Sequence, residues 1–148
     1  MDLNFSVQNK KPVIYLAGHV KEKEYRDYCI EKYSKDFMLF DPIREIDENV
    51  IRENNKYFNE KEIGLKISKL DKVAILNSDV LVAYIRKPTF GTIMEIFFAF
   101  TMDIDTYIVN ENKQYENDYW LLSHSHKIFS NLDNCFNYLK IKLIKKDI

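Results

Sequence analysis

The pattern of apolar and polar positions predicts strands that alternate with helices. Residues 13–18 and 79–85 are apolar runs with little alternation, which is typical of strands buried on both faces of a parallel sheet. Shorter apolar runs predict further strands at residues 37–40, 106–109 and 127–129. The sequence therefore predicts five strands distributed along the chain.

Helical spacing of apolar residues fills the intervals between these strands. Helices are predicted at residues 21–35, 59–74 and 91–100, and a last helix begins at Asn131. Residues 43–59 are strongly polar and too long for a tight turn. We expect them to form an excursion or a lid over something else.

This alternation predicts a doubly wound, three-layer α/β fold with a sheet of five parallel strands. The chain has 148 residues, so a single domain, 1–148, is the simplest organisation. The common order for five such strands is 2-1-3-4-5, which changes direction between strands one and three. The carboxyl ends of these two strands are therefore predicted to meet at a ligand-binding crevice.

The predicted crevice collects residues from both strand ends. The first strand contributes Tyr15 and ends at Gly18 and His19, whereas Gly91 and Glu95 follow the third strand. Open α/β sheets bind ligands at this edge, so these five residues are candidates for a functional site.

Glu95 lies near the start of an otherwise apolar helix, and two interpretations fit it. Residues 92–95 match a capping box, in which Thr92 and Glu95 satisfy free N–H groups of the first helical turn. Alternatively, Glu95 is a reactive carboxylate at the carboxyl edge of the sheet. The local sequence leaves both interpretations open.

Composition argues against several other classes of function. Charged residues make up 30% of the chain, but the formal net charge is −1, which argues against a partner that is a nucleic acid polymer or an anionic membrane. No apolar run reaches membrane-spanning length without a charge, and no signal-peptide pattern is present. Cys29 and Cys135 have no metal-ligand spacing and are expected to be buried, reduced thiols of a cytoplasmic protein. The histidines are not spaced for a metal either, so no metal site is predicted.

Three segments together resemble the nucleoside 2-deoxyribosyltransferase family. They are Tyr15-Leu16-Ala17-Gly18, the pair Asp71 and Asp79, and Gly91-Thr92-Ile93-Met94-Glu95-Ile96-Phe97-Phe98-Ala99. Their order and spacing within residues 13–100 carry the resemblance, since each segment alone is weakly specific. The resemblance implies a flavodoxin-like fold and a double displacement at the anomeric carbon of a nucleoside.

The resemblance also implies roles for three residues. Glu95 would be the nucleophile that forms a covalent glycosyl-enzyme, Asp71 would hold a sugar hydroxyl or act as the acid/base partner, and Tyr15 would orient Glu95. These residue types suit the chemistry, because retention at a sugar carbon needs a carboxylate opposite the base and a second group that protonates the base. No cofactor is implied. The family forms homo-oligomers in which a neighbour completes each active site, so a homo-oligomer is expected here.

One loop departs from the family pattern. Residues 86–90 lack the aspartate with which family members hold the base. The loop resembles that of the related 2-deoxynucleoside 5′-monophosphate N-glycosidases, where a hydroxyl residue contacts the phosphate, and Thr89 is the matching residue. Lys21, Arg86 and Lys87 are candidates for positive charge near such a phosphate.

Two further features bear on the predicted site. Arg44 follows the turn at residues 41–43 and is a candidate that reaches back over the pocket, although a surface position is equally compatible. The asparagine that the family supplies from a neighbouring subunit has no clean counterpart. Residues 119–124 lie about where it is expected, and Ser123 and His124 are weak substitutes.

The sequence thus predicts an enzyme that cleaves N-glycosidic bonds of nucleosides or nucleotides. The first interpretation is a 2-deoxyribosyltransferase that passes the sugar to another free base, and the close alternative is a hydrolase acting on nucleoside 5′-monophosphates. A non-catalytic nucleotide-binding module, in which Glu95 is only a cap, is the alternative from a different class. The predicted substrate-binding residues are Gly18, His19, Arg44, Thr89 and Gly91.

Overall fold

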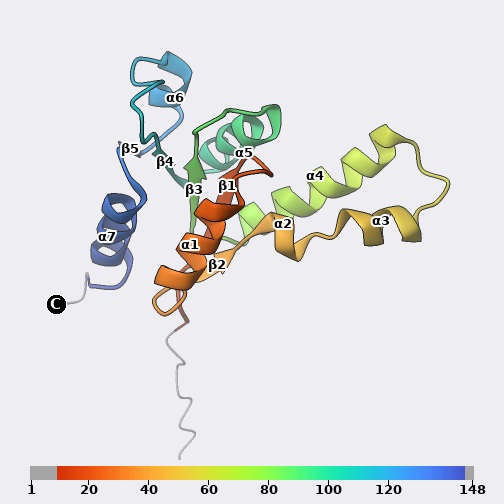
Figure 1. Cartoon of the computed structure of the whole chain (residues 1–148), viewed down its shortest axis with the longest axis horizontal. Coiled ribbons are helices and arrows are strands. Elements are labelled where there is room, and N and C mark those ends of the chain that lie inside the picture. Colours follow the sequence, from red (N-terminus) through yellow and green to blue (C-terminus); the bar gives the residue numbers. More distant parts are fainter. Residues whose placement is uncertain (1–9, 146–148) are drawn as a thin grey trace, which may run out of the picture.

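A parallel sheet organises the computed structural model, which describes residues 10–145 (Figure 1). Within that range the sheet has five strands in the order β2-β1-β3-β4-β5, and every neighbouring pair is parallel. The predicted architecture and strand order are confirmed, and the single domain over residues 1–148 stays a prediction. The strands are β1 (Val13–Gly18), β2 (Met38–Phe40), β3 (Val80–Tyr84), β4 (Asp105–Val109) and β5 (Lys127–Phe129).

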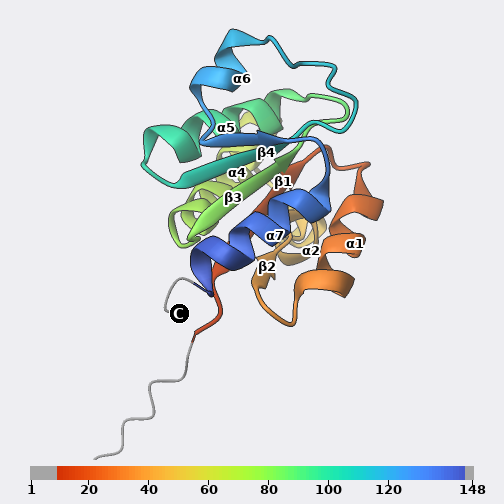
Figure 2. The same cartoon turned by 90° about the vertical axis from the view of Figure 1, so that its left-hand side faces the viewer.

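Helices cover both faces of this sheet (Figure 2). One face packs against α1 and α7, and the other packs against α4, α5 and α6. Within residues 10–145, no helix is both long enough and apolar enough to cross a membrane. The helices are α1 (Lys23–Tyr33), α2 (Pro42–Glu45), α3 (Glu48–Asn54), α4 (Glu60–Leu76), α5 (Phe90–Thr101), α6 (Tyr119–Ser123) and α7 (Leu132–Leu143).

Alternate residues of the central strands enter two separate apolar cores. Ile14 of β1 belongs to the core under α1 and α7, whereas its neighbours Tyr15 and Ala17 belong to the core under α4 and α5. All residues of β3 are buried in the same alternating way. Burial on both faces explains why both strands lack polar residues. Cys29 and Cys135 are free and buried in the first core, as predicted.

Side-chain caps define where two of the predicted helices begin. Asn59 caps α4 by accepting a hydrogen bond from the Glu62 backbone N–H at 2.9 Å. Asn131 caps α7 in the same way, with the Asn134 N–H at 2.8 Å. Each cap satisfies an otherwise free N–H group and contributes about 1 kcal/mol. Both helix starts agree with the sequence prediction.

The predicted excursion between β2 and α4 contains two short helices. Its caps are Asp41 for α2 and Asp47 for α3. The α3 helix and the first part of α4 extend away from the sheet (Figure 1). Arg52 joins these two helices, because its guanidinium pairs with Glu48 of α3 and with Glu60 at the start of α4. The excursion is therefore an ordered part of the fold with its own polar contacts.

Candidate active site

A cavity of about 360 Å³ opens at the carboxyl ends of β1 and β3, where the strand order changes direction. Open α/β sheets bind ligands at this position, and the volume falls within the range of small-molecule sites. All the predicted substrate-binding residues except Arg44 line it. The full lining is Gly18, His19, Val20, Arg26, Pro42, Ile43, Ile46, Glu48, Ile67, Asp71, Thr89, Gly91, Thr92 and Glu95.

Three elements bring the predicted catalytic residues together. Glu95 of α5 and Asp71 of α4 line the cavity, and the buried Tyr15 of β1 places its hydroxyl near both carboxylates. Within residues 10–145, the Tyr15 hydroxyl, Glu95 Oε2 and Arg26 Nε are buried without a hydrogen-bond partner. Buried polar atoms are normally paired, so the Tyr15 and Glu95 atoms are available to a ligand or, after a small movement, to each other.

Burial changes the ionisation of this trio. It raises the pKa of Glu95 to about 7. The nearby Tyr15 hydroxyl lowers this pKa, the negative charge of Asp71 raises it further, and the positive charge of Arg26 lowers it. Burial also raises the pKa of Asp71. The pKa of Tyr15 is raised far above its usual value by burial and by both carboxylates, so Tyr15 stays a hydrogen-bond donor. A carboxyl group that titrates near neutral pH is typical of catalytic sites.

Glu95 does not cap α5. The helix begins at Phe90, and its cap is Thr89, whose Oγ1 accepts a hydrogen bond from the Thr92 N–H at 3.4 Å and lies 3.0 Å from Thr92 Oγ1. The predicted capping box over residues 92–95 is wrong, because the helix begins one turn earlier and Glu95 lies in its second turn. Capping therefore does not explain why this carboxylate is buried.

Arg26 is a lining residue that the sequence analysis did not identify. This arginine of α1 is only 1% exposed, and its guanidinium pairs with Asp41 at 3.2 Å. A signal was present in the sequence, since Arg26 precedes Cys29 by three residues and Tyr33 by seven, on the buried side of α1. Long charged side chains are rarely buried without a partner, so its position marks it as unusual.

The other candidate cations do not reach the cavity. Arg44 pairs with Asp27 of α1 and with Asp41, and its side chain is half exposed. The expectation that Arg44 extends over the pocket is therefore not met, because these two aspartates hold its guanidinium elsewhere. Neither Lys21 nor the two cations of residues 86–90 are among the lining residues that the structure describes.

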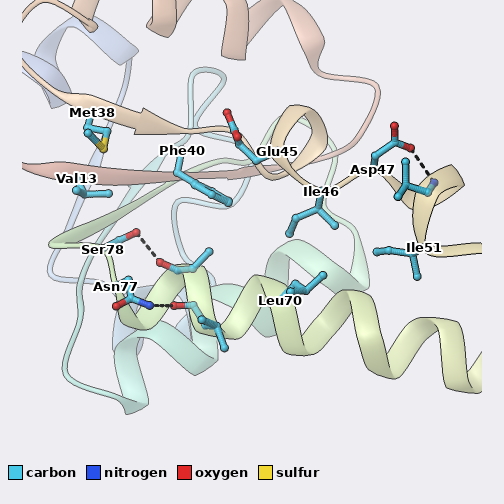
Figure 3. A pocket seen from close by; sticks show the side chains of 13 residues that line it. Val13, Met38, Phe40, Glu45, Ile46, Asp47, Ile51, Leu70, Asn77 and Ser78 are labelled. Carbon is cyan, nitrogen blue, oxygen red and sulfur yellow. Dashed lines mark hydrogen bonds between the residues drawn. The ribbon is translucent and has the colours of Figure 1, made fainter. Parts of the chain in front are cut away.

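A larger groove of about 700 Å³ lies at the amino ends of β1 and β2 (Figure 3). Its lining is mostly apolar and includes Val13, Met38 and part of α4. It contains none of the three predicted catalytic residues. Of these two cavities, the smaller one is the candidate active site, because it lies where the strand order changes direction and contains the predicted catalytic side chains of Asp71 and Glu95. The structure shows no group of three His, Cys, Asp or Glu side chains fit to hold a metal within residues 10–145.

Structural comparison finds this fold in several solved protein chains, including the following two. A conserved protein from Enterococcus faecalis V583 superposes with a TM-score of 0.59 at 20% identity, covering 90% of this chain and 99% of that chain. The CMP N-glycosidase BcmB from Clostridium botulinum superposes with a TM-score of 0.56 at 18% identity, covering 88% of this chain and 99% of that chain. The chain shares their fold. Its sequence matches no family model and no curated protein, so the likeness is one of fold.

The buried carboxylate leads to a prediction about stability. The folded-state pKa of Glu95, about 7, lies above the unfolded value of about 4.3, so this residue lowers stability as pH rises between these values. We expect Glu95→Gln to raise the free energy of unfolding at pH 8, by about 1–3 kcal/mol, and to change it little at pH 4. Denaturant titrations at the two pH values measure both quantities.

Glu111→Gln is the matched control for this measurement. Glu111 follows β4 and accepts a hydrogen bond from the Tyr84 hydroxyl at 2.8 Å, away from the candidate active site. Its replacement should not stabilise the protein at pH 8. A lower stability of Glu95→Gln at pH 8 would contradict the argument that burial disfavours the charged form of Glu95.

Proposed function

We propose that this protein is an enzyme that cleaves the N-glycosidic bond of a nucleoside or nucleotide through a covalent glycosyl–Glu95 intermediate. The observation that carries the proposal is the buried carboxylate of Glu95, which meets Asp71 and Tyr15 at the cavity where the strand order changes direction. The name of one structural neighbour, a CMP N-glycosidase, supports the same class of reaction.

The first half-reaction forms a glycosyl ester. A carboxylate oxygen of Glu95 attacks the anomeric carbon while the bond from that carbon to the base nitrogen breaks. The electron pair of this bond leaves with the base, and Asp71 donates a proton to the base as a general acid. Burial raises the pKa of Asp71, which is the direction that a general acid needs. The Tyr15 hydroxyl donates a hydrogen bond that orients Glu95.

The second half-reaction decides the product. A second base or a water molecule attacks the anomeric carbon, the ester bond to Glu95 breaks, and Asp71 accepts the proton of the attacking group. Attack by a base gives a 2-deoxyribosyltransferase, which is the first form of the proposal. Attack by water gives a hydrolase of nucleoside 5′-monophosphates, and the activity named for the structural neighbour favours this second form.

A substrate panel tests the proposal. The protein is incubated with deoxynucleosides, ribonucleosides and their 5′-monophosphates, with and without an acceptor base, and products are separated by chromatography. A new nucleoside that forms only with the acceptor identifies a transferase, whereas free base released in both conditions identifies a hydrolase. Binding without turnover of any compound would favour the non-catalytic module instead.

Glu95→Gln is expected to abolish turnover while the fold stays intact. The amide keeps the shape of the side chain but cannot form the glycosyl ester, so kcat should fall by roughly 10³-fold or more. Glu111→Gln again serves as the control and should retain activity. High activity per folded molecule of Glu95→Gln would show that the Glu95 carboxylate is not the nucleophile.

A 5′-phosphate is expected to improve binding through Thr89. This residue lines the cavity and caps α5, so its hydroxyl lies beside the free N–H groups of a helix start, which attract anions. We expect a nucleoside 5′-monophosphate to bind at least as well as the matching nucleoside. Thr89→Val should reduce the affinity ratio by about tenfold, because a hydrogen bond to a charged group is worth about 1.5–3 kcal/mol.

The ratio of two dissociation constants separates this effect from lost capping, since both ligands bind the same variant. Thr89→Ser keeps the hydroxyl and should keep the preference. Competition titrations in which the free nucleoside always binds more tightly would reject the phosphate site. Lys21, Arg86 and Lys87 do not line the cavity, so we do not expect the affinity ratio to depend strongly on salt.

Assembly into homo-oligomers also stays a prediction. The apolar run of residues 97–100 is a candidate interface, and in it Ala99 is buried, whereas Phe97 is 49% exposed. Met94, one turn earlier on α5, is 68% exposed. We expect sedimentation velocity to show a dimer or larger species at micromolar concentration, and Met94→Glu to weaken it. A fully active monomer would contradict the expected shared site.

A further inference from the structure

The guanidinium of Arg26 connects two segments of the cavity wall. Its Nη2 donates to the carbonyl of Gly18, the last residue of β1, at 2.7 Å, and its Nη1 donates to the carbonyl of His19, in the loop that follows, at 2.8 Å. Its Nε lies 3.2 Å from Asp41 Oδ1, which belongs to the segment between β2 and α2. Asp41 in turn caps α2 by accepting a hydrogen bond from the Ile43 N–H at 3.0 Å.

Both of these segments line the cavity. Gly18 and His19 come from the first segment, and Pro42 and Ile43 follow Asp41 in the second. The two Nη atoms of Arg26 hydrogen-bond the first segment and its Nε forms an ion pair with Asp41 of the second, so one planar guanidinium links the two segments. A lysine has one donor group and cannot hold this geometry on both sides.

Arg26 is also the only cationic side chain that lines the cavity within residues 10–145. The groups that act on Glu95 come from three elements, namely Tyr15 on β1, Asp71 on α4 and Arg26 on α1. His19 and Glu48 line the cavity as well. Burial and the negative charge of Asp71 favour neutral Glu95, whereas a nucleophile must be ionised. A fixed positive charge in the same cavity acts in the opposite direction.

We propose that Arg26 is a positioning residue for the reaction at Glu95, which holds the end of β1 and the loop after it against Asp41 and places a positive charge in the cavity that Glu95 lines. The inference rests on the proposed function, because it assumes that Glu95 acts as a nucleophile. Asp41, the partner of Arg26, also acts on Glu95. Its buried negative charge offsets part of the effect that the positive charge of Arg26 has on Glu95. The two residues are therefore expected to shift the ionisation of Glu95 in opposite directions.

The test is a pH titration of Glu95 that needs no turnover. Protein labelled with ¹³C at the glutamate carboxyl carbon is followed by NMR, and the Glu95 resonance is the one that is missing in Glu95→Gln. We expect Arg26→Met to raise the midpoint of Glu95 by about one pH unit, because it removes a nearby positive charge. Asp41→Asn should lower the midpoint, and Arg26→Lys should leave it nearly unchanged.

Lys23→Met is the matched control. Lys23 is an exposed cation of the same helix, and its partner is Asp27, so removing its charge should leave the Glu95 midpoint unchanged. If Arg26→Met does not fold, Asp41→Asn and Arg26→Lys still decide the question. Unchanged midpoints in Arg26→Met or Asp41→Asn, or equal shifts in Arg26→Met and Lys23→Met, would overturn the inference.

Kinetics test the positioning part. Arg26→Lys should raise KM more than it lowers kcat, because the charge remains while the two segments lose their common support. The acidic limb of kcat/KM should move with the NMR midpoint in Asp41→Asn. Absence of turnover in the unmodified protein would refute the proposed function while the titration still reports on Arg26. Normal turnover with kcat and KM unaltered in Arg26→Lys would refute the positioning role.

Discussion

A carboxylate that is buried at the edge of a parallel sheet is the constraint on which the rest of this site depends. Burial of Glu95 raises its pKa to about 7, so the fold keeps a titratable group where an apolar residue would be more stable. Such sites persist when the surrounding structure stabilises them. Here the Tyr15 hydroxyl and the Arg26 guanidinium favour the ionised form, and both are themselves fixed in buried positions.

The sheet topology explains why these groups meet. β1 and β3 are adjacent and parallel, with Gly18 paired to Tyr84, so the loops that follow both strands leave the sheet at the same point. α5 follows β3 after a short loop and places Glu95 in the cavity, while α1 follows β1 and places Arg26 there. Asp71 reaches the cavity by another route, because α4 passes the carboxyl edge before it leads into β3. The site is thus a consequence of strand order rather than of any single motif.

The strands and their order could be predicted because double burial leaves a strong local signal. The start of α5 could not be predicted, because Thr89 and Thr92 are both residues that can cap a helix. In the structure the helix begins after Thr89, which is its cap. Arg26 was not identified as a site residue because its burial depends on its ion pair with Asp41, which is distant in sequence and lies after another strand. The sequence left two positions open for Arg44 for the same reason, as its position depends on Asp27 of α1. Local pattern specifies elements, whereas ion pairs between elements decide where charged side chains go.

The same geometry explains why fold and trio alone do not choose between transfer and hydrolysis. Both proposed reactions would pass through the glycosyl–Glu95 intermediate, and they would differ in what reaches the anomeric carbon once the base has left. The excursion forms another part of the cavity wall. Its lining residues include the apolar Ile43 and Ile46 and the charged Glu48. Apolar side chains exclude water and favour a planar base, while a charged one admits water. In the proposed reaction, the excursion therefore supplies both the apolar and the charged part of this wall, and the ion pair of Arg26 with Asp41 joins the start of the excursion to the end of β1.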